Sequence, residues 1–155
     1  MAKLIKVLGR MGGQQAVSPF PVSVPVFKGA VSTIKPGMLV ITDPVNPGFW
    51  YAAPTGTDTT TLINAGVACS ESSETVTVNG SVSIDTAEVL LVQIKALDPT
   101  ALVTTMVGVA WILSVAGGSY TLDQGTSANG VFNILSYDNI VDGNCTCLLT
   151  THWRG

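Results

Sequence analysis

The sequence predicts an all-β protein whose body is a small β-sandwich or barrel, preceded by an extended N-terminal arm. Three observations support this prediction. The chain holds 20 Val and 18 Thr, and β-branched residues favour strands over helices. Turn signals rich in Gly, Pro, Asn and Asp recur between short apolar runs. Helix signals are scarce, and the 155 residues amount to one domain.

The arm is predicted over residues 1–27, and the β-rich body over residues 28–155. Gly9, Gly12 and Gly13 interrupt any helix in the arm, and three prolines follow between residues 19 and 25. Proline cannot donate to a β-ladder, so we expect this segment to have no fold of its own. Its apolar side chains, such as Leu4 and Phe20, indicate a limb that lies along another surface rather than a disordered tail.

The first strands of the body are predicted from turns and alternation. Pro36-Gly37 leads into an apolar strand at residues 38–42. Residues 75–78 and 81–84 alternate polar and apolar on either side of Asn79-Gly80. Such a pair favours a type I′ turn, so we expect a β-hairpin here.

Further strands are expected over residues 88–96, 106–115, 119–122, 131–136 and 145–151. The apolar run at 88–96 predicts a strand buried on both faces. Asp98-Pro99 offers a helix cap followed by a proline, which predicts one short helical turn. A Gly-Val-Ala core occurs at residues 66–68 and again at 108–110. It is too short to establish a duplication, and the glycine is interpreted as a bulge or close approach in a strand.

The charge is low and unevenly distributed. Charged residues make up only 11% of the chain, against about 25% in an average protein, which excludes charge-rich bundles, coiled coils and acidic or basic disordered tails. Residues 1–35 carry a charge of +5, whereas the rest has two bases against ten acids, a net charge of −8. The acidic body would repel nucleic-acid phosphates. We therefore expect no direct nucleic-acid partner, and some surface that is reserved for protein neighbours.

Catalytic signatures are lacking in the sequence, and we expect no enzyme. The single histidine, His152, lies close to the C-terminus, where rigid positioning for catalysis is rare. Cys145 and Cys147 at i and i+2 of a strand share one face, and with His152 and Cys69 they would offer four zinc ligands. We favour the simpler interpretation of buried free thiols. No metal or cofactor is therefore predicted.

No targeting or membrane segment is predicted. The N-terminal apolar run is too short for a signal peptide, and the longest apolar stretch, residues 102–116, is broken by Thr, Gly and Ser. Three cysteines give no disulfide framework and fit a reducing compartment. We expect synthesis in the cytoplasm, which is a reducing compartment, and no membrane partner.

With catalysis, metal binding and nucleic-acid binding disfavoured, we expect the basic and aromatic residues to bind a protein partner. The basic arm residues and the large aromatics are typical of contacts between proteins. The predicted partner-binding residues are Lys3, Lys6, Arg10, Phe20, Trp50 and Trp153.

The body resembles the small decoration, or cement, proteins of tailed-bacteriophage heads. The resemblance rests on Val26-Phe27-Lys28-Gly29-Ala30-Val31 and Lys35-Pro36-Gly37-Met38-Leu39-Val40, which look like that family's opening strands joined by a turn ending in Pro-Gly. It also rests on the Gly66-Val67-Ala68 step before an alternating hairpin. It covers roughly residues 26–95, and it explains neither residues 117–123 nor the C-terminal strands.

This resemblance implies a β-tulip or barrel-like body that forms a homotrimer on the outer surface of the capsid. The major capsid protein would be the partner, and the role would be to stabilise the shell against internal DNA pressure. Other decoration proteins are monomers or dimers. An alternative is a carbohydrate- or receptor-binding β-module of a phage tail or fibre, which would use aromatics beside polar loops at Trp50 or Tyr137.

Overall fold

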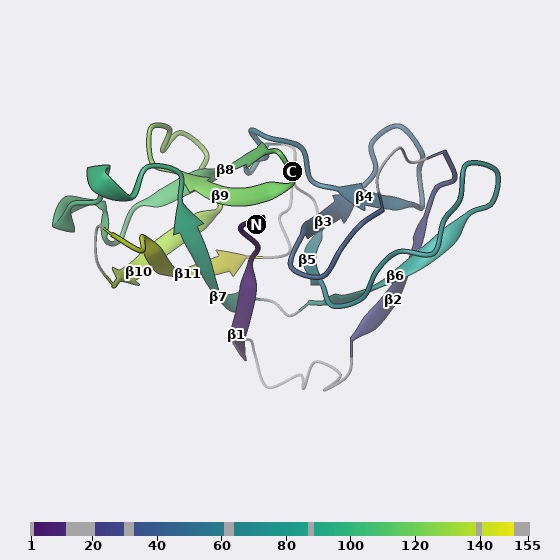
Figure 1. Ribbon diagram of the computed structural model, residues 1–155, viewed down its shortest axis with the longest axis horizontal. Helices are drawn as coiled ribbons and strands as arrows, with labels where there is room; N and C mark the ends of the chain where they lie inside the picture. Colours follow the sequence, from purple (N-terminus) through teal and green to yellow (C-terminus); the bar gives the residue numbers. More distant parts are fainter. Residues whose placement is uncertain are drawn as a thin grey trace.

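The regular secondary structure of the described residues is almost entirely β-strand. Figure 1 shows the computed structural model, which describes residues 2–11, 21–29, 33–60, 64–86, 89–138 and 141–150. The strands in these residues are β1 (Lys6–Met11), β2 (Val22–Val26), β3 (Leu39–Thr42), β4 (Trp50–Ala52), β5 (Ala65–Ala68), β6 (Gly80–Asp85), β7 (Val89–Ala96), β8 (Ala110–Ala116), β9 (Ser119–Asp123), β10 (Phe132–Tyr137) and β11 (Asn144–Thr150). Two 3-10 helices, η1 (Pro99–Ala101) and η2 (Thr104–Met106), lie between β7 and β8.

Strands β2 to β6 form the first barrel, closed in the order β2-β4-β3-β5-β6. All neighbouring pairs are antiparallel except β2 and β4, which are parallel. The remaining strands form a six-stranded sheet in the order β1-β7-β11-β10-β8-β9. Strand β9 also pairs in parallel with the end of β7, at Lys95↔Thr121 and Ala96↔Leu122. This pairing closes the five strands β7, β8, β9, β10 and β11 into a second ring. We call this ring the second barrel, and the prediction of a small all-β barrel is confirmed.

The two barrels have the same strand connectivity. In each, the first strand in the chain is parallel to the third and antiparallel to the fifth, and the second is antiparallel to the third and the fourth. The fourth and fifth strands are also antiparallel in both. Strands β2 to β6 therefore correspond in order to β7 to β11. The two barrels lie side by side along the long axis of the molecule (Figure 1).

Each barrel has an apolar interior, and a third apolar layer joins them. The first interior holds small aliphatic side chains such as Val40, Val82 and Ile84. The second interior continues without a break onto the outer faces of β3 and β5, where Leu39, Ile41, Ala65 and Val67 are buried. Strands β3 and β5 are thus buried on both faces, which is why they read as unbroken apolar runs.

The N-terminal segment is part of the fold, so the prediction of an arm without structure of its own is wrong for its described residues. Strand β1 pairs antiparallel with β7, and β2 is a wall of the first barrel. Ile5 is buried in the shared apolar layer, and its N–H donates to the Gly37 carbonyl at 2.9 Å. The composition of residues 1–27 alone predicts an arm, because the strands that pair with β1 and β2 lie far along the chain.

Residues 2–11 span both barrels, and we call them the strap. The Lys3 carbonyl accepts from the Tyr120 N–H at 2.7 Å, which ties the strap to β9. Arg10 forms an ion pair with Asp85, at the end of β6 in the first barrel. The strap therefore fastens the two barrels together (Figure 1).

The predicted hairpin at Asn79-Gly80 is wrong. Residues 75–78 are not a strand, and β6 pairs with β2 and β5 instead. The Thr75 hydroxyl accepts from the Val78 N–H at 3.0 Å, which closes a local turn. Val76 and Val78 are 79% and 59% exposed. The apolar residues of this alternating stretch therefore do not pack against the core.

The other predicted elements hold with shifted ends. Strands β3, β9, β10 and β11 match their predicted ranges to within one residue at each described end, and η1 begins at the Asp98 cap, whose carboxylate accepts from the Thr100 N–H. Strand β8 starts only at Ala110, because η2 and Gly108, with φ of +83°, precede it. Strand β7 alternates buried and half-buried side chains rather than burying both faces.

Candidate binding site

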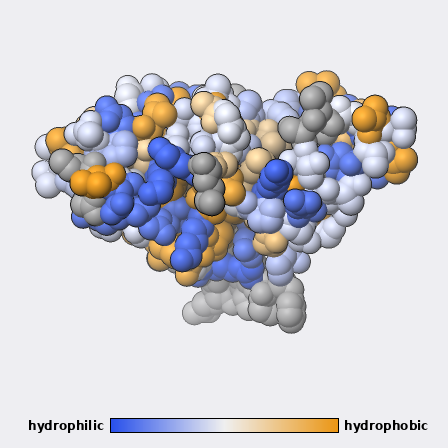
Figure 2. Space-filling model, in the orientation of Figure 1, coloured by the Kyte–Doolittle hydropathy of each residue, from blue (hydrophilic) through white to orange (hydrophobic). Residues whose placement is uncertain are grey.

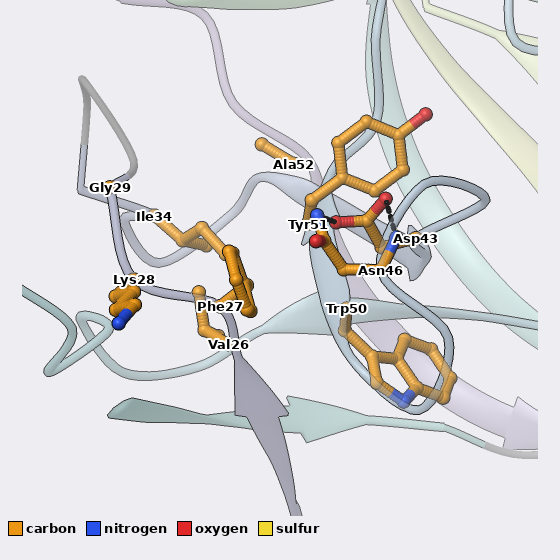
Figure 3. Close-up of a pocket in the computed structure, with 10 residues that line it drawn as sticks. All are labelled: Val26, Phe27, Lys28, Gly29, Ile34, Asp43, Asn46, Trp50, Tyr51 and Ala52. Atoms are coloured by element: carbon orange, nitrogen blue, oxygen red, sulfur yellow. Dashed lines mark hydrogen bonds between the residues drawn. The ribbon is translucent and has the colours of Figure 1, made fainter. Parts of the chain in front are cut away.

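A pocket lies on the first barrel beside the loop between β3 and β4. It has a volume of about 340 Å³. Its walls combine apolar and aromatic side chains with a few polar ones: Val26, Phe27, Lys28, Gly29, Ile34, Asp43, Asn46, Trp50, Tyr51 and Ala52. Figure 3 shows Asp43 and Asn46 between Tyr51 and Trp50, with Phe27 and Ile34 on the facing side.

The aromatic residues of the pocket are Trp50 and Tyr51 of β4 and Phe27, which follows β2. Trp50 and Ala52 pack toward the interior of the first barrel, whereas Tyr51 packs toward the shared layer. Phe27 stacks edge-to-face on Phe49, with ring centroids 5.1 Å apart. Half-buried aromatic faces next to polar groups are typical of sites that bind amphipathic ligands.

Asp43 organises the loop that forms one side of the pocket. Its carboxylate accepts from the Val45 N–H at 2.8 Å, the Asn46 N–H at 3.2 Å and the Asn46 side-chain amide at 2.9 Å. Partial burial opposes ionisation, but these hydrogen bonds outweigh it and hold the pKa of Asp43 below its usual value. An ionised carboxylate with most of its acceptor sites occupied is a poor general base at neutral pH. The arrangement favours binding over proton transfer.

Tyr51 also has a shifted pKa. Burial raises the pKa of its hydroxyl, and the nearby Asp43 carboxylate adds to the effect. The hydroxyl stays protonated at neutral pH and serves as a hydrogen-bonding group.

The predicted partner-binding residues that the structure describes, Lys3, Lys6, Arg10 and Trp50, do not gather at one place. Trp50 lies in the pocket wall. Lys3 and Lys6 are exposed in the strap, and Arg10 forms an ion pair with Asp85 in which both side chains are partly buried. Phe20 and Trp153 lie outside the described residues, as does His152.

The interpretation of buried free thiols holds for Cys145 and Cys147 but is wrong for Cys69. Cys145 and Cys147 are buried on one face of β11, and Cys69 is exposed after β5 in the other barrel. Burial raises the pKa of Cys145 to about 11, with a contribution from Asp138, and burial also raises the pKa of Cys147. Among the described residues, no three His, Cys, Asp or Glu side chains come together as a metal site.

The site contains residues that sequence reasoning did not select. Phe27, Asp43 and Asn46 line the pocket, and the turn signals at Asp43-Pro44 and Asn46-Pro47-Gly48 marked this loop without assigning it a role. The signal that would have found them is the run of aromatics at residues 49–51 directly after that turn.

Exposed aliphatic side chains form a second candidate feature. Figure 2 shows hydrophobic patches at both ends of the long axis. Among the described residues, the exposed large hydrophobic side chains are Leu4, Leu8, Val22, Val45, Val76, Val78, Leu97, Val103, Val107, Leu135 and Val141.

Comparison of the chain with protein-family models, with curated proteins and with solved structures found no match. None of the helices in the described part of the chain is long and apolar enough to cross a membrane.

Proposed function

We propose that the protein is a structural binding protein of a tailed-phage head, a decoration or cement protein on the outer surface of the capsid. The observation that carries the proposal is the placement of exposed aliphatic side chains at both ends of an elongated molecule (Figure 2). Val76, in the β5–β6 connection, and Val141, in the β10–β11 connection, are 79% and 83% exposed. Clustered exposed apolar surface marks sites of protein contact.

The proposed mechanism is physical rather than catalytic. A protein that touches two shell subunits at once binds the assembled lattice and not the dispersed subunits. It therefore stabilises the lattice by mass action, and many copies acting together resist the pressure of packaged DNA. The low charge, 11% of residues, supports burial of surface against the shell and against neighbouring copies. A homotrimer is the assembly implied by the family resemblance.

The test is decoration of shells that lack the protein. Purified chain is added to expanded shells of the major capsid protein, and bound copies are counted after sedimentation. We expect saturable binding at a fixed ratio to capsid subunits and a higher melting temperature of the shell. Failure of the chain to sediment with shells would contradict the proposal. The mass in solution, measured by analytical ultracentrifugation against the chain mass of 16.0 kDa, tests the trimer separately.

The pocket favours a second candidate, a carbohydrate- or receptor-binding module of a phage tail or fibre. The half-buried Trp50 offers a ring face, and Asp43 and Asn46 offer polar groups beside it (Figure 3). Glycan-array binding that is lost in Trp50→Ala and kept in Val141→Ser would support this candidate. Absence of binding by the unaltered protein to any glycan would reject its carbohydrate form.

A further inference from the structure

The pocket of the first barrel combines aromatic rings with one negative charge. Phe27, Trp50 and Tyr51 line it, and each is half-buried, so each side chain keeps some surface toward solvent. Phe27 is held by its edge-to-face contact with Phe49, with ring centroids 5.1 Å apart. The faces of aromatic rings are electronegative, so a pocket lined by several rings attracts cations.

Asp43 gives the pocket wall its negative charge. Burial opposes its ionisation and hydrogen bonds within its own loop favour it, and the balance holds the pKa of Asp43 below its usual value. No basic side chain contributes to this shift, and within the described part of the chain no Lys or Arg forms an ion pair with Asp43. Lys28 also lines the pocket, but Figure 3 shows it beyond Phe27, on the side opposite Asp43. The carboxylate is therefore ionised without a neighbouring cation.

The hydrogen-bonding capacity of Asp43 is mostly used within its own loop. The carboxylate accepts from the Val45 and Asn46 N–H groups and from the Asn46 side-chain amide, and a carboxylate has about four acceptor sites. A primary ammonium or a guanidinium would lose hydrogen bonds to water on entering the pocket, and Asp43 would replace few of them. A quaternary ammonium has no N–H group and needs no acceptor. The charge, the rings and the few free acceptor sites of Asp43 together favour an alkylated ammonium ligand.

We infer that the pocket binds an alkylated ammonium group, such as the trimethylammonium group of choline or of a trimethylated lysine. The cation would lie against the rings of Trp50 and Phe27, and Asp43 would balance its charge. The pocket volume of about 340 Å³ suits a small ligand, since small-molecule sites measure about 300–1,000 Å³. The inference goes beyond the proposed function and does not rest on it, because the chain alone supplies every residue of the pocket.

The first experiment titrates the unaltered chain with cations and with a neutral analogue. Tetramethylammonium is the group alone, choline adds a hydroxyethyl arm, and the analogue is choline with a carbon atom in place of the nitrogen. Isothermal titration calorimetry gives the affinities. The indole N–H resonance of Trp50, identified by its absence in Trp50→Leu, shows by NMR whether the ligand is in the pocket. We expect both cations to bind saturably, and the neutral analogue to bind about tenfold more weakly or not at all.

Variants then test the ring and the charge separately. Trp50→Leu keeps an apolar side chain without the indole and should weaken choline binding by about 5- to 30-fold, the range of a desolvated cation–π contact. Asp43→Asn removes the charge and should weaken choline binding by about tenfold or more. Val45→Ser is the matched control, because Val45 lies in the same loop, is 80% exposed and does not line the pocket. This control should bind choline as the unaltered chain does. Circular dichroism and the melting temperature establish that each variant is folded.

Absence of binding by both cations would overturn the inference, as would equal binding of choline and its neutral analogue or an unchanged affinity in Asp43→Asn. Saturable binding of a neutral sugar without either cation would also overturn it, in favour of the carbohydrate candidate. The comparison of choline with its analogue uses the unaltered chain, so it decides the question even where a variant fails to fold.

The source of the cation is distinguished by a further titration with a peptide that contains trimethyl-lysine. Tighter binding of the peptide than of choline would support a protein as the source, and tighter binding of choline would support a free solute. No shell takes part in these titrations, so their failure is separate from a failure of the proposed function.

Discussion

The two barrels share one connectivity but differ in what fills and surrounds it. Strands β7 to β11 run for five to eight residues and enclose Phe132 with large aliphatic side chains. Strands β2 to β6 run for three to six residues, and among the described residues they enclose seven buried Val, Ile and Ala side chains. The same topology therefore supports a larger apolar core in the second barrel and a smaller one in the first.

The loops differ in the opposite sense, because the first barrel has the longer loop between its second and third strands. Strands β8 and β9 are joined by Gly117-Gly118, both with positive φ, the tight turn that suits a hairpin. The corresponding β3–β4 connection, residues 43–49, is longer and carries the pocket. We infer from this comparison that the second barrel contributes more of the stability. The first barrel has a smaller core and a longer loop, which lines the pocket.

The largest expected effect comes from removing the strap that joins the barrels. Deleting residues 1–11 removes the β1–β7 pairing, the burial of Ile5 and the Arg10–Asp85 ion pair. We expect a larger loss in the free energy of unfolding than for any substitution below, measured by urea denaturation. A truncated chain with unchanged stability would show that the strap does not couple the barrels.

The two interiors are compared next by one core truncation in each. Phe132→Ala should lower the free energy of unfolding by about 3–5 kcal/mol, because the ring is completely buried. Val82→Ala in the first barrel should cost about 2 kcal/mol, since it removes less apolar surface. Urea unfolding of both variants gives the values. A larger cost for Val82→Ala would reverse the assignment of stability to the second barrel.

A smaller effect is expected at the contact between β5 and β6. A Cβ on Gly66 would lie 2.7 Å from Ile84 Cδ1 and 2.9 Å from the Asp85 carbonyl oxygen. Gly66→Ala should therefore cost about 1–3 kcal/mol of unfolding free energy.

Gly9 in β1 is the matched control for Gly66. An added Cβ there meets only Leu91, at an ordinary 4.0 Å. Gly9→Ala should be close to neutral by the same denaturation assay. Equal effects at the two glycines would mean that the close approach of β5 and β6 is unimportant.

The smallest effect is a difference in thiol chemistry between the barrels. At neutral pH a thiol reagent should titrate Cys69 in the folded protein, and Cys145 and Cys147 only after unfolding, because both are completely buried. Rapid reaction of all three in the folded state would show that the second barrel opens readily.

The same thiols predict a loss of stability in alkali. The pKa of Cys145 rises from 9.0 to about 11 in the folded protein. Its contribution is therefore complete below about pH 9 and is lost as the pH rises through 11. The slope of unfolding free energy against pH should flatten in Cys145→Ala over this interval.

The sequence predicted those strands that are marked by a preceding turn or by an apolar or alternating run. Strands β3 and β9 follow turn pairs with positive φ at Gly37 and Gly118, and β10 and β11 have alternating or apolar runs. Residues 66–68 were interpreted as a close approach of strands, and the contacts around Gly66 confirm this.

The pairing of strands that are distant in the chain could not be predicted from the sequence. Strand β1 joins β7 more than 80 residues away, with Val7 opposite Val92, and nothing in residues 6–11 names that partner. The shared connectivity of the two barrels was not visible in the sequence either, because the Gly-Val-Ala repeat falls on β5 and at the start of β8, which do not correspond. The pocket residues were missed because β2 and β4 meet only through the closure of the barrel.

The most direct test of the proposed structural role is a cryo-electron microscopy reconstruction of shells decorated with this chain. We expect ordered density for the chain at fixed positions on the outer surface of the shell. Shells without added density at saturating protein would contradict the account.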